Sequence, residues 1–162
     1  MAIAVKVSGL MLDPLTNMPI VILKSDDGDR ILPIWVGPFE AQAIAMKRDN
    51  LVPPRPMTHD LLAAALQTLQ AAIEKVVITD LKENTFYAVI HVRSAGGPIT
   101  LDSRPSDAIA LALRAESPIF VEPQVFDKSA AGSGERKPEE SAERLKNWFE
   151  SVDPEDFSKY HM

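Results

Sequence analysis

The chain has 162 residues, of which 25% are charged, with a formal net charge of −6 and no cysteine. This length suits one domain with a small appendage, and the lack of cysteine excludes disulfides, thiolate metal sites and cysteine nucleophiles. Because a negative average charge repels nucleic acid, the composition excludes a broadly basic protein that binds nucleic acid through charge alone.

The sequence carries no sign of a membrane-bound or exported protein. No apolar run approaches the ~18 residues that a membrane-spanning helix needs. The first residues have strand character and lack the basic start of a signal peptide. We therefore expect a cytoplasmic protein with no membrane partner.

Three strands and a helix are predicted in the first fifty residues. The segments with strand character are 5–12, the apolar run 20–23, and 30–36, which follows an Asp-Gly turn. A helix is expected from Pro38 to about Arg48, because proline suits the first helical position and Glu40 places an acid in the first turn.

A proline-rich connector at 53–56 precedes a second predicted helix. Thr58 is its expected N-cap, since a threonine hydroxyl can accept a hydrogen bond from a free N–H group of the first turn. The apolar residues that recur at helical spacing are Leu61, Leu62, Ala65, Leu66, Leu69 and Ile73. This spacing predicts a helix that packs in the core.

The second half of the chain repeats the pattern of the first. The segments predicted here are strands at 76–81, 86–93 and 99–102, a helix at 105–116 and a short strand at 119–121. Pro105 and Asp107 stand where Pro38 and Glu40 stand in the first half, each pair at the start of an alanine-rich helix. We therefore predict the α+β class, with internally duplicated β-β-β-α units that form a mixed or mainly antiparallel sheet with packed helices.

A C-terminal helical arm is expected after this domain. Residues 1–126 are predicted to form the domain, and the Ser-, Ala- and Gly-containing segment 127–137 a flexible linker. In residues 138–162 the apolar positions i, i+3, i+4 and i+7 of a short charged helix are Leu145, Trp148, Phe149 and Val152. Because a helix this short is marginal alone, we expect it to dock on its own domain or on a partner subunit.

Three segments of the chain resemble one known family. They are PIWVGPFEAQA at 33–43, PPRPMTHDLL at 53–62 and SRPSDAIALA at 103–112. Together they are similar to the bifunctional nuclease domain, also described as DNase-RNase proteins, over about residues 3–125. The resemblance implies a compact α/β domain that forms a homo-oligomer (a dimer or trimer) and cleaves both DNA and RNA, as plant members do. It supplies no agreed catalytic set, so the site has to be inferred from the residues themselves.

Metal-assisted phosphodiester hydrolysis needs carboxylates that converge on one or two divalent cations. The predicted catalytic residues are the acids Glu40, Asp60, Asp102 and Asp107 and the base His59. The expected ligands of Mg²⁺ or Mn²⁺ are Asp102 and Asp107. The predicted substrate-binding residues are Arg55, Arg104 and Ser106, because arginines can clamp phosphate. Neither a phosphate-binding loop nor a dinucleotide fingerprint occurs, so no organic cofactor is expected.

A structural interpretation competes with these roles. Glu40, Asp60 and Asp107 all lie in a first helical turn, where an acid satisfies free N–H groups without any catalysis. Arg104 precedes a proline and places a cation against the helix dipole, which indicates an ion pair with Asp102 or Asp107, or contact with an anion. The alternative function is therefore a non-catalytic oligomeric module that binds a protein or an anion and has no nuclease activity.

One predicted strand face combines aromatic and basic residues. Tyr87, His91 and Arg93 alternate along the strand at 86–93 and so share a face. Such residues can stack with and attract nucleic acid. They suit a subunit interface equally well, and the interface is the interpretation that we favour.

Overall fold

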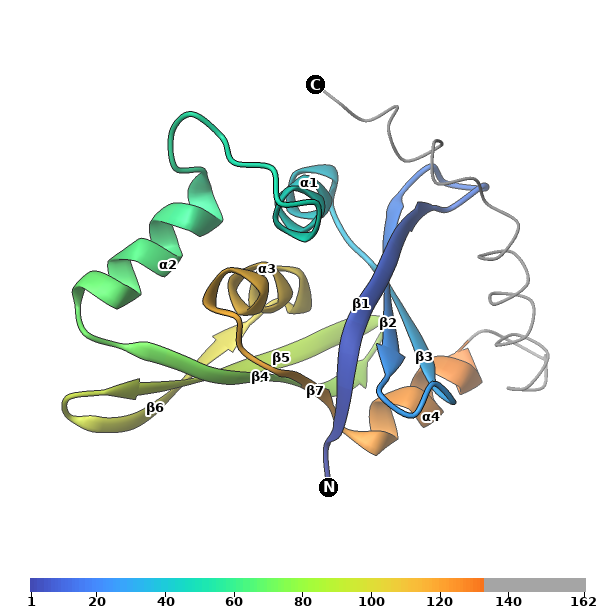
Figure 1. Cartoon of the computed structure of the whole chain (residues 1–162). Helices are drawn as coiled ribbons and strands as arrows, with labels where there is room; N and C mark the ends of the chain where they lie inside the picture. Colours follow the sequence, from blue (N-terminus) through green and yellow to red (C-terminus); the bar gives the residue numbers. More distant parts are fainter. Residues whose placement is uncertain (133–162) are drawn as a thin grey trace.

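A mixed sheet of seven strands runs through residues 1–132, the part of the chain that the computed structural model describes (Figure 1). The strand order is β3-β2-β1-β7-β4-β5-β6. The strands are β1 (Ile3–Leu12), β2 (Pro19–Ser25), β3 (Ile31–Trp35), β4 (Ala72–Lys82), β5 (Thr85–Ser94), β6 (Gly97–Ser103) and β7 (Ile119–Val121). The helices in this part of the chain are α1 (Pro38–Arg48), α2 (Thr58–Thr68), α3 (Pro105–Ala115) and α4 (Pro123–Gly132).

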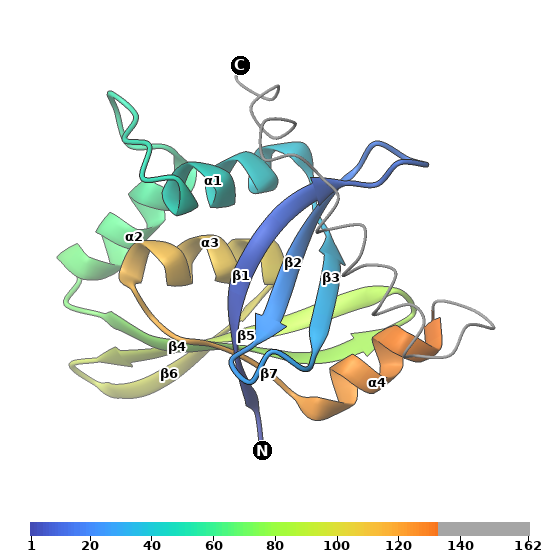
Figure 2. The ribbon, with the colours of Figure 1, turned by 45° about the vertical axis from the view of Figure 1, so that its right-hand side comes forward.

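Two antiparallel meanders form the two halves of the sheet. The first consists of β1, β2 and β3, and the second of β4, β5 and β6. The short β7 joins them at the centre, because it pairs antiparallel with β1 and parallel with β4. Figures 1 and 2 show the strands of the first meander running steeply across those of the second, with α3 in the angle between them. The α+β class and the mixed sheet are thus confirmed.

The predicted β-β-β-α order occurs twice in the described residues. The first unit ends with α1 and the second with α3, and α2 lies between the two units in the chain. The strands β1 and β4, which begin the two units, lie on either side of β7. This order agrees with the duplication hypothesis without demonstrating it, so a common origin of the units stays a prediction.

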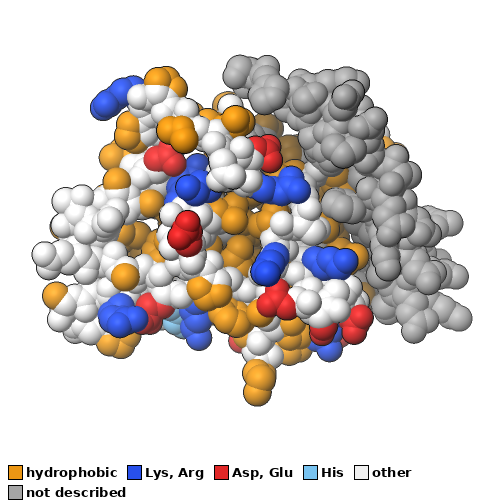
Figure 3. All heavy atoms as spheres, viewed as in Figure 1, with side chains coloured by type: hydrophobic (Ala, Val, Ile, Leu, Met, Phe, Trp, Pro, Cys, Tyr) orange, Lys and Arg blue, Asp and Glu red, His pale blue; other side chains and the backbone are white. Residues whose placement is uncertain are grey.

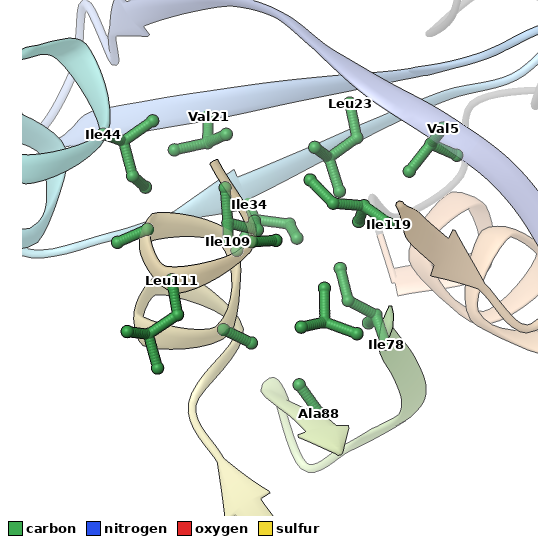
Figure 4. Packing of buried hydrophobic residues seen from close by; sticks show 14 of the residues in the cluster. Val5, Val21, Leu23, Ile34, Ile44, Ile78, Ala88, Ile109, Leu111 and Ile119 are labelled. Carbon is green, nitrogen blue, oxygen red and sulfur yellow. The ribbon is translucent and has the colours of Figure 1, made fainter. Parts of the chain in front are cut away.

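The core lies where α3 packs into the angle of the sheet. Ile109 and Leu111 of α3 are at most 1% exposed and share one cluster with Ile34 of β3 and Ile78 of β4 (Figure 4). The small residues that let α3 approach the sheet are Ala108, Ala110 and Ala112, all fully buried. Because a close-packed interior resists displacement, the first turn of α3 is held at a fixed position relative to both meanders.

The prediction that α2 belongs to the core is wrong. None of its eleven residues is buried, and Leu61 is 63% exposed while Leu69, just after the helix, is 74% exposed. Only Ala63 of this helix packs against the main cluster as a partly buried side chain. The reason is that α3 already fills the angle of the sheet, so α2 lies outside it. Helical spacing identifies an apolar face but not what covers that face.

The start of the predicted linker is helical. Helix α4 extends to Gly132 and so includes residues 127–132. Val125, which is fully buried, anchors its first turn, and the alanines at 130 and 131 favour helix. The rest of that linker and the predicted arm at 138–162 lie outside the described residues. Within residues 1–132 no helix has the length and apolar character to cross a membrane.

Candidate functional site

A groove of about 790 Å³ lies where α1, α2, β6 and α3 come together. Its apolar part is lined by residues that include Ile90 of β5, Leu101 of β6, Leu111 of α3 and Leu62 and Leu66 of α2. Its polar lining contains Glu40, His59, Asp102, Arg104 and Asp107. Five of the eight predicted site residues are therefore brought to one groove.

Two matching helix starts place the acids Glu40 and Asp107. Helix α1 begins at Pro38 and α3 at Pro105, and each acid lies in the first turn of its helix. Helix α1 packs against α3. The first turns of the two helices lie close enough for one arginine to reach both carboxylates.

Arg104 is that arginine. It precedes α3 in an extended conformation, with φ −69° and ψ 144°, as expected before a proline. Its Nε donates to Asp107 Oδ2 at 2.9 Å, and its Nη2 lies 3.0 Å from Glu40 Oε1. The predicted ion pair with Asp107 is confirmed, while the second partner is Glu40 and not Asp102. Because two acids surround the guanidinium, its unfavourable position at a helix N-terminus is compensated.

His59 adds a histidine–carboxylate pair to the cluster. Its Nε2 lies 2.8 Å from Asp107 Oδ1, and its side chain is 13% exposed. A neutral imidazole that donates Nε2–H to a carboxylate has an unprotonated Nδ1. No residue in 1–132 hydrogen-bonds this Nδ1, and every fully buried side-chain polar atom there has a partner. The Nδ1 atom therefore reaches solvent and can accept a proton.

The carboxyl group of Asp107 stays ionised in these surroundings. Burial alone would raise its pKa, but hydrogen bonds from His59 and Arg104, together with their charges, hold the pKa below its ordinary value. An ionised Asp107 accepts the hydrogen bond at 2.8 Å and so orients the imidazole ring. The arrangement can therefore support proton transfer at His59.

Asp60 has a structural role outside the groove. Its Oδ2 accepts the Met57 N–H at 2.9 Å, and its Oδ1 accepts from Arg114 Nε at 2.6 Å. Met57, not Thr58, is thus the N-cap of α2. Burial opposes the charge of Asp60, but these hydrogen bonds and the charge of Arg114 lower its pKa overall.

Arg114 was not singled out by the sequence. Its side chain is 8% exposed and also donates to the carbonyl oxygens of Ala110, at 2.9 Å, and Ala43, at 3.1 Å. It therefore joins α1, α2 and α3 and fixes the turn that carries His59. The sequence hinted at Arg114 only by placing a basic residue in the last turn of α3. Basic residues are common at that position in helices, so the pattern did not predict its contacts.

Of the remaining predicted residues, one lies at the groove and two lie away from it. Asp102 is exposed at the groove and has no hydrogen bond or ion pair to the side chains of residues 1–132. Arg55 is exposed in the connector, and Ser106 is 6% exposed below the first turn of α3. Neither Arg55 nor Ser106 lines the groove.

The polar residues are arranged as ion pairs and not as a cation cage. In the described part of the chain no group of three or more His, Asp or Glu side chains is placed to hold a metal ion. Both oxygens of Asp107 are engaged by His59 and Arg104, and Glu40 is engaged by Arg104. As placed, these residues do not fit a Mg²⁺ or Mn²⁺ centre. The ion at Asp102 and Asp107 stays a prediction, and no step below depends on it.

Residues 21–133 match the family described as the bifunctional nuclease domain. The chain belongs to this family. The matched region contains every residue of the Glu40–His59–Arg104–Asp107 cluster, together with Asp60 and Arg114. The membership expected from the three sequence segments is confirmed.

The chain is similar in sequence to two kinds of known proteins. An uncharacterised protein of Mycobacterium tuberculosis is 39% identical over 94% of this chain and 96% of its own length. Bifunctional nuclease 1 of Oryza sativa and a bifunctional nuclease of Oryza minuta are 30% identical over 62% of this chain. That match covers 32% of each rice protein.

Proposed function

We propose that this chain hydrolyses phosphodiester bonds of DNA and RNA at the polar part of the groove. The observation that carries the proposal is the His59–Asp107–Arg104 cluster, which combines a proton acceptor and an anion-binding group in a family with members named bifunctional nucleases. A cytoplasmic location, which the lack of cysteine favours, belongs to the same proposal.

Arg104 binds the scissile phosphate in this proposal. A guanidinium has five N–H donors, of which Arg104 uses one at Nε for Asp107 and one at Nη2 for Glu40. The side chain is 65% exposed, so the other donors face solvent. A phosphate can dock on these donors while the two carboxylates keep the guanidinium in place.

His59 activates the attacking water in this proposal. Its Nδ1 takes a proton from water as the water oxygen bonds to phosphorus, and the ester oxygen leaves with a proton returned by the imidazolium. Asp107 stabilises the imidazolium through the Nε2–H hydrogen bond. Because water and not the ribose 2′-hydroxyl is the nucleophile, one mechanism serves both DNA and RNA.

The surface charge limits how substrate binds. On the face shown in Figure 3, Lys and Arg side chains lie beside Asp and Glu and form no continuous basic stripe. With a net charge of −6, long-range attraction of nucleic acid is absent. The proposal therefore predicts weak substrate binding, with little sequence preference and phosphate contacts confined to Arg104.

The test is cleavage by the purified chain of plasmid DNA and of RNA, each with Mg²⁺, Mn²⁺ or EDTA. We expect cleavage of both substrates by the wild-type chain. For Arg104→Lys we expect the cleavage rate or the apparent affinity for substrate to fall at least about 10-fold, because lysine cannot replace bidentate contacts. Lys6→Gln is the matched control, since Lys6 is an exposed cation on β1. Cleavage in EDTA supports the metal-free mechanism, and cleavage restored by one cation supports the metal prediction. No cleavage under any condition refutes the proposal.

A second function is a non-catalytic module that binds an anion or a protein at Arg104. The observation in its favour is that the cluster is already held together by internal ion pairs, as expected of residues whose role is to stabilise the fold. These residues are Glu40, His59, Arg104 and Asp107. This alternative predicts that oligonucleotide binds without being cleaved. Binding would then be lost in Arg104→Gln and unchanged in Lys6→Gln.

A further inference from the structure

The apolar part of the groove has no role in the proposed hydrolysis, which uses the polar end alone. Nine of the seventeen residues that line the groove are apolar, among them Phe39, Met57, Leu62 and Leu101. These four side chains are 75%, 45%, 45% and 40% exposed. Sites for small molecules are typically clefts of roughly 300–1,000 Å³ with mostly apolar walls and a few polar groups. The groove, of about 790 Å³, has this character.

Phe39 lies at the rim of the groove, beside the residues that hold Arg104. It is in the first turn of α1, and the next residue, Glu40, forms the 3.0 Å ion pair with Arg104. The start of a helix does not require an aromatic side chain at this position, because α3 has Ser106 there, which is 6% exposed. Neither helix initiation nor burial in the core therefore accounts for Phe39, and its exposed ring is free to contact a ligand in the groove.

An unpaired nucleotide matches both parts of the groove. Its phosphate is an anion and complements the exposed guanidinium of Arg104. Its base has flat apolar faces that stack on aromatic rings. In a double helix each base face is covered by the neighbouring base pair, so a duplex offers the groove only its sugar–phosphate surface. The groove therefore favours an unpaired base over a paired one.

We propose that the apolar part of the groove holds an unpaired base next to the phosphate on Arg104, and that the chain prefers single-stranded DNA and RNA to duplex. This inference rests on the proposed function for the position of the phosphate and adds the substrate class to it. The base contacts supply affinity that a chain with a net charge of −6 cannot gain from long-range attraction. Because every base can stack, the preference for unpaired strands brings little sequence preference.

The test is equilibrium binding of a single-stranded oligonucleotide that contains 2-aminopurine, a base whose fluorescence falls when it stacks. The same oligonucleotide paired with its complement is the duplex probe, and the anisotropy of an end label reports the affinity for both. The full-length chain is used as His59→Gln, which lacks the proposed proton acceptor, and a gel verifies that the probes stay intact. We expect 2-aminopurine fluorescence to fall when the single strand binds, with a dissociation constant at least about 10-fold below that of the duplex.

Phe39→Ser gives the start of α1 the residue that α3 has at the same position. In the His59→Gln background it should weaken binding of the single strand about 10-fold, because one stacked base is lost, and leave binding of the duplex unchanged. Thermal unfolding should be unaffected, since the side chain is exposed. The matched control is Tyr87→Ser, at an aromatic residue of β5 that is 42% exposed and does not line the groove. This variant should bind the single strand as its parent does.

Salt dependence gives a second readout. A single phosphate contact to a single strand predicts that the logarithm of the association constant falls with the logarithm of salt concentration at a slope of about −0.7. A slope several times steeper would show that charge and not the base carries the binding, and would overturn the proposal.

Three other results would overturn it. They are equal affinity for single strand and duplex, unchanged binding by Phe39→Ser, which would mean another occupant of the groove such as a second copy of the chain, or weakened binding by Tyr87→Ser, which would place the base on β5.

The outcome is separable from that of the proposed hydrolysis. Binding of the single strand through Phe39, with no cleavage by the wild-type chain, would support the base site and refute the hydrolysis. Cleavage of single strand and duplex at equal rates, with Phe39→Ser unchanged in both binding and cleavage, would refute the base site and leave the hydrolysis supported.

Discussion

Helices α2 and α3 have the same length and a similar apolar sequence, yet they differ completely in burial. Each has eleven residues; seven of those in α3 are buried, and none in α2. Helix α3 fills the angle between the two meanders, whereas α2 lies beside it and is connected to it by Arg114 and by the His59–Asp107 pair. The candidate site therefore combines a carboxylate on an element fixed by the core with a histidine on an element fixed by polar contacts.

The largest expected effect comes from the core of α3. We expect Ile109→Ala to lower the free energy of unfolding by about 2–5 kcal/mol, because it leaves a cavity at a fully buried position. Leu61→Ala on α2 should change it by less than about 0.5 kcal/mol when the chain is monomeric. Urea unfolding measures both values. Equal losses for the two variants would contradict the difference between the helices.

A smaller effect is expected from the connection between them. Arg114→Ala should lower the free energy of unfolding by about 1–3 kcal/mol, because Asp60 and two backbone carbonyls lose a donor. It should also slow any cleavage, since the turn that carries His59 loses its support. The matched control is Arg93→Ala, whose ion pair with Glu74 is exposed and should contribute at most about 1 kcal/mol. If both variants have equal stability, Arg114 is not the connection that fixes α2.

The smallest effect is the pH dependence contributed by Asp107. Its pKa is lower in the folded chain than the ordinary 3.8. A carboxyl group with a lowered pKa stabilises the fold above its unfolded pKa, and that contribution is lost as the pH falls through the folded pKa. Wild type should therefore exceed Asp107→Asn in stability at pH 7, with a difference that shrinks as the pH falls below 3.8. A difference that is the same at both ends of that range would contradict the ionised state of Asp107.

The sequence predicted the local features of the fold better than its packing. Helices α1 and α3 begin at Pro38 and Pro105, as predicted, because proline and an acid specify a helix start through local geometry. The burial of α2 was predicted wrongly, because an apolar stripe looks the same whether its own domain or another molecule covers it. A start of β4 at Ala72 was also missed, since the helical spacing of apolar residues continues to Ile73.

The sequence predicted which residues belong to the candidate site but not which of them contact one another. Arg104 was identified because a cation at a helix N-terminus breaks a local rule, and the structure shows the compensating carboxylates. The pairing of His59 with Asp107 joins residues 48 positions apart, and that of Arg114 with Asp60 residues 54 apart. Contacts across such separations depend on how helices pack, which spacing within one element does not encode.

In the proposed function, His59 and Asp107 act together in phosphodiester cleavage. The most direct test of this joint role is the initial rate of RNA and plasmid cleavage by His59→Gln and Asp107→Asn, with Asp29→Asn, an exposed acid in the turn between β2 and β3, as control. We predict that His59→Gln lowers the rate by about 10²–10⁴-fold, that Asp107→Asn also lowers it, and that the control is unchanged. Wild-type rates in both site variants, with thermal unfolding showing that all three variants are folded, would contradict a joint role of His59 and Asp107.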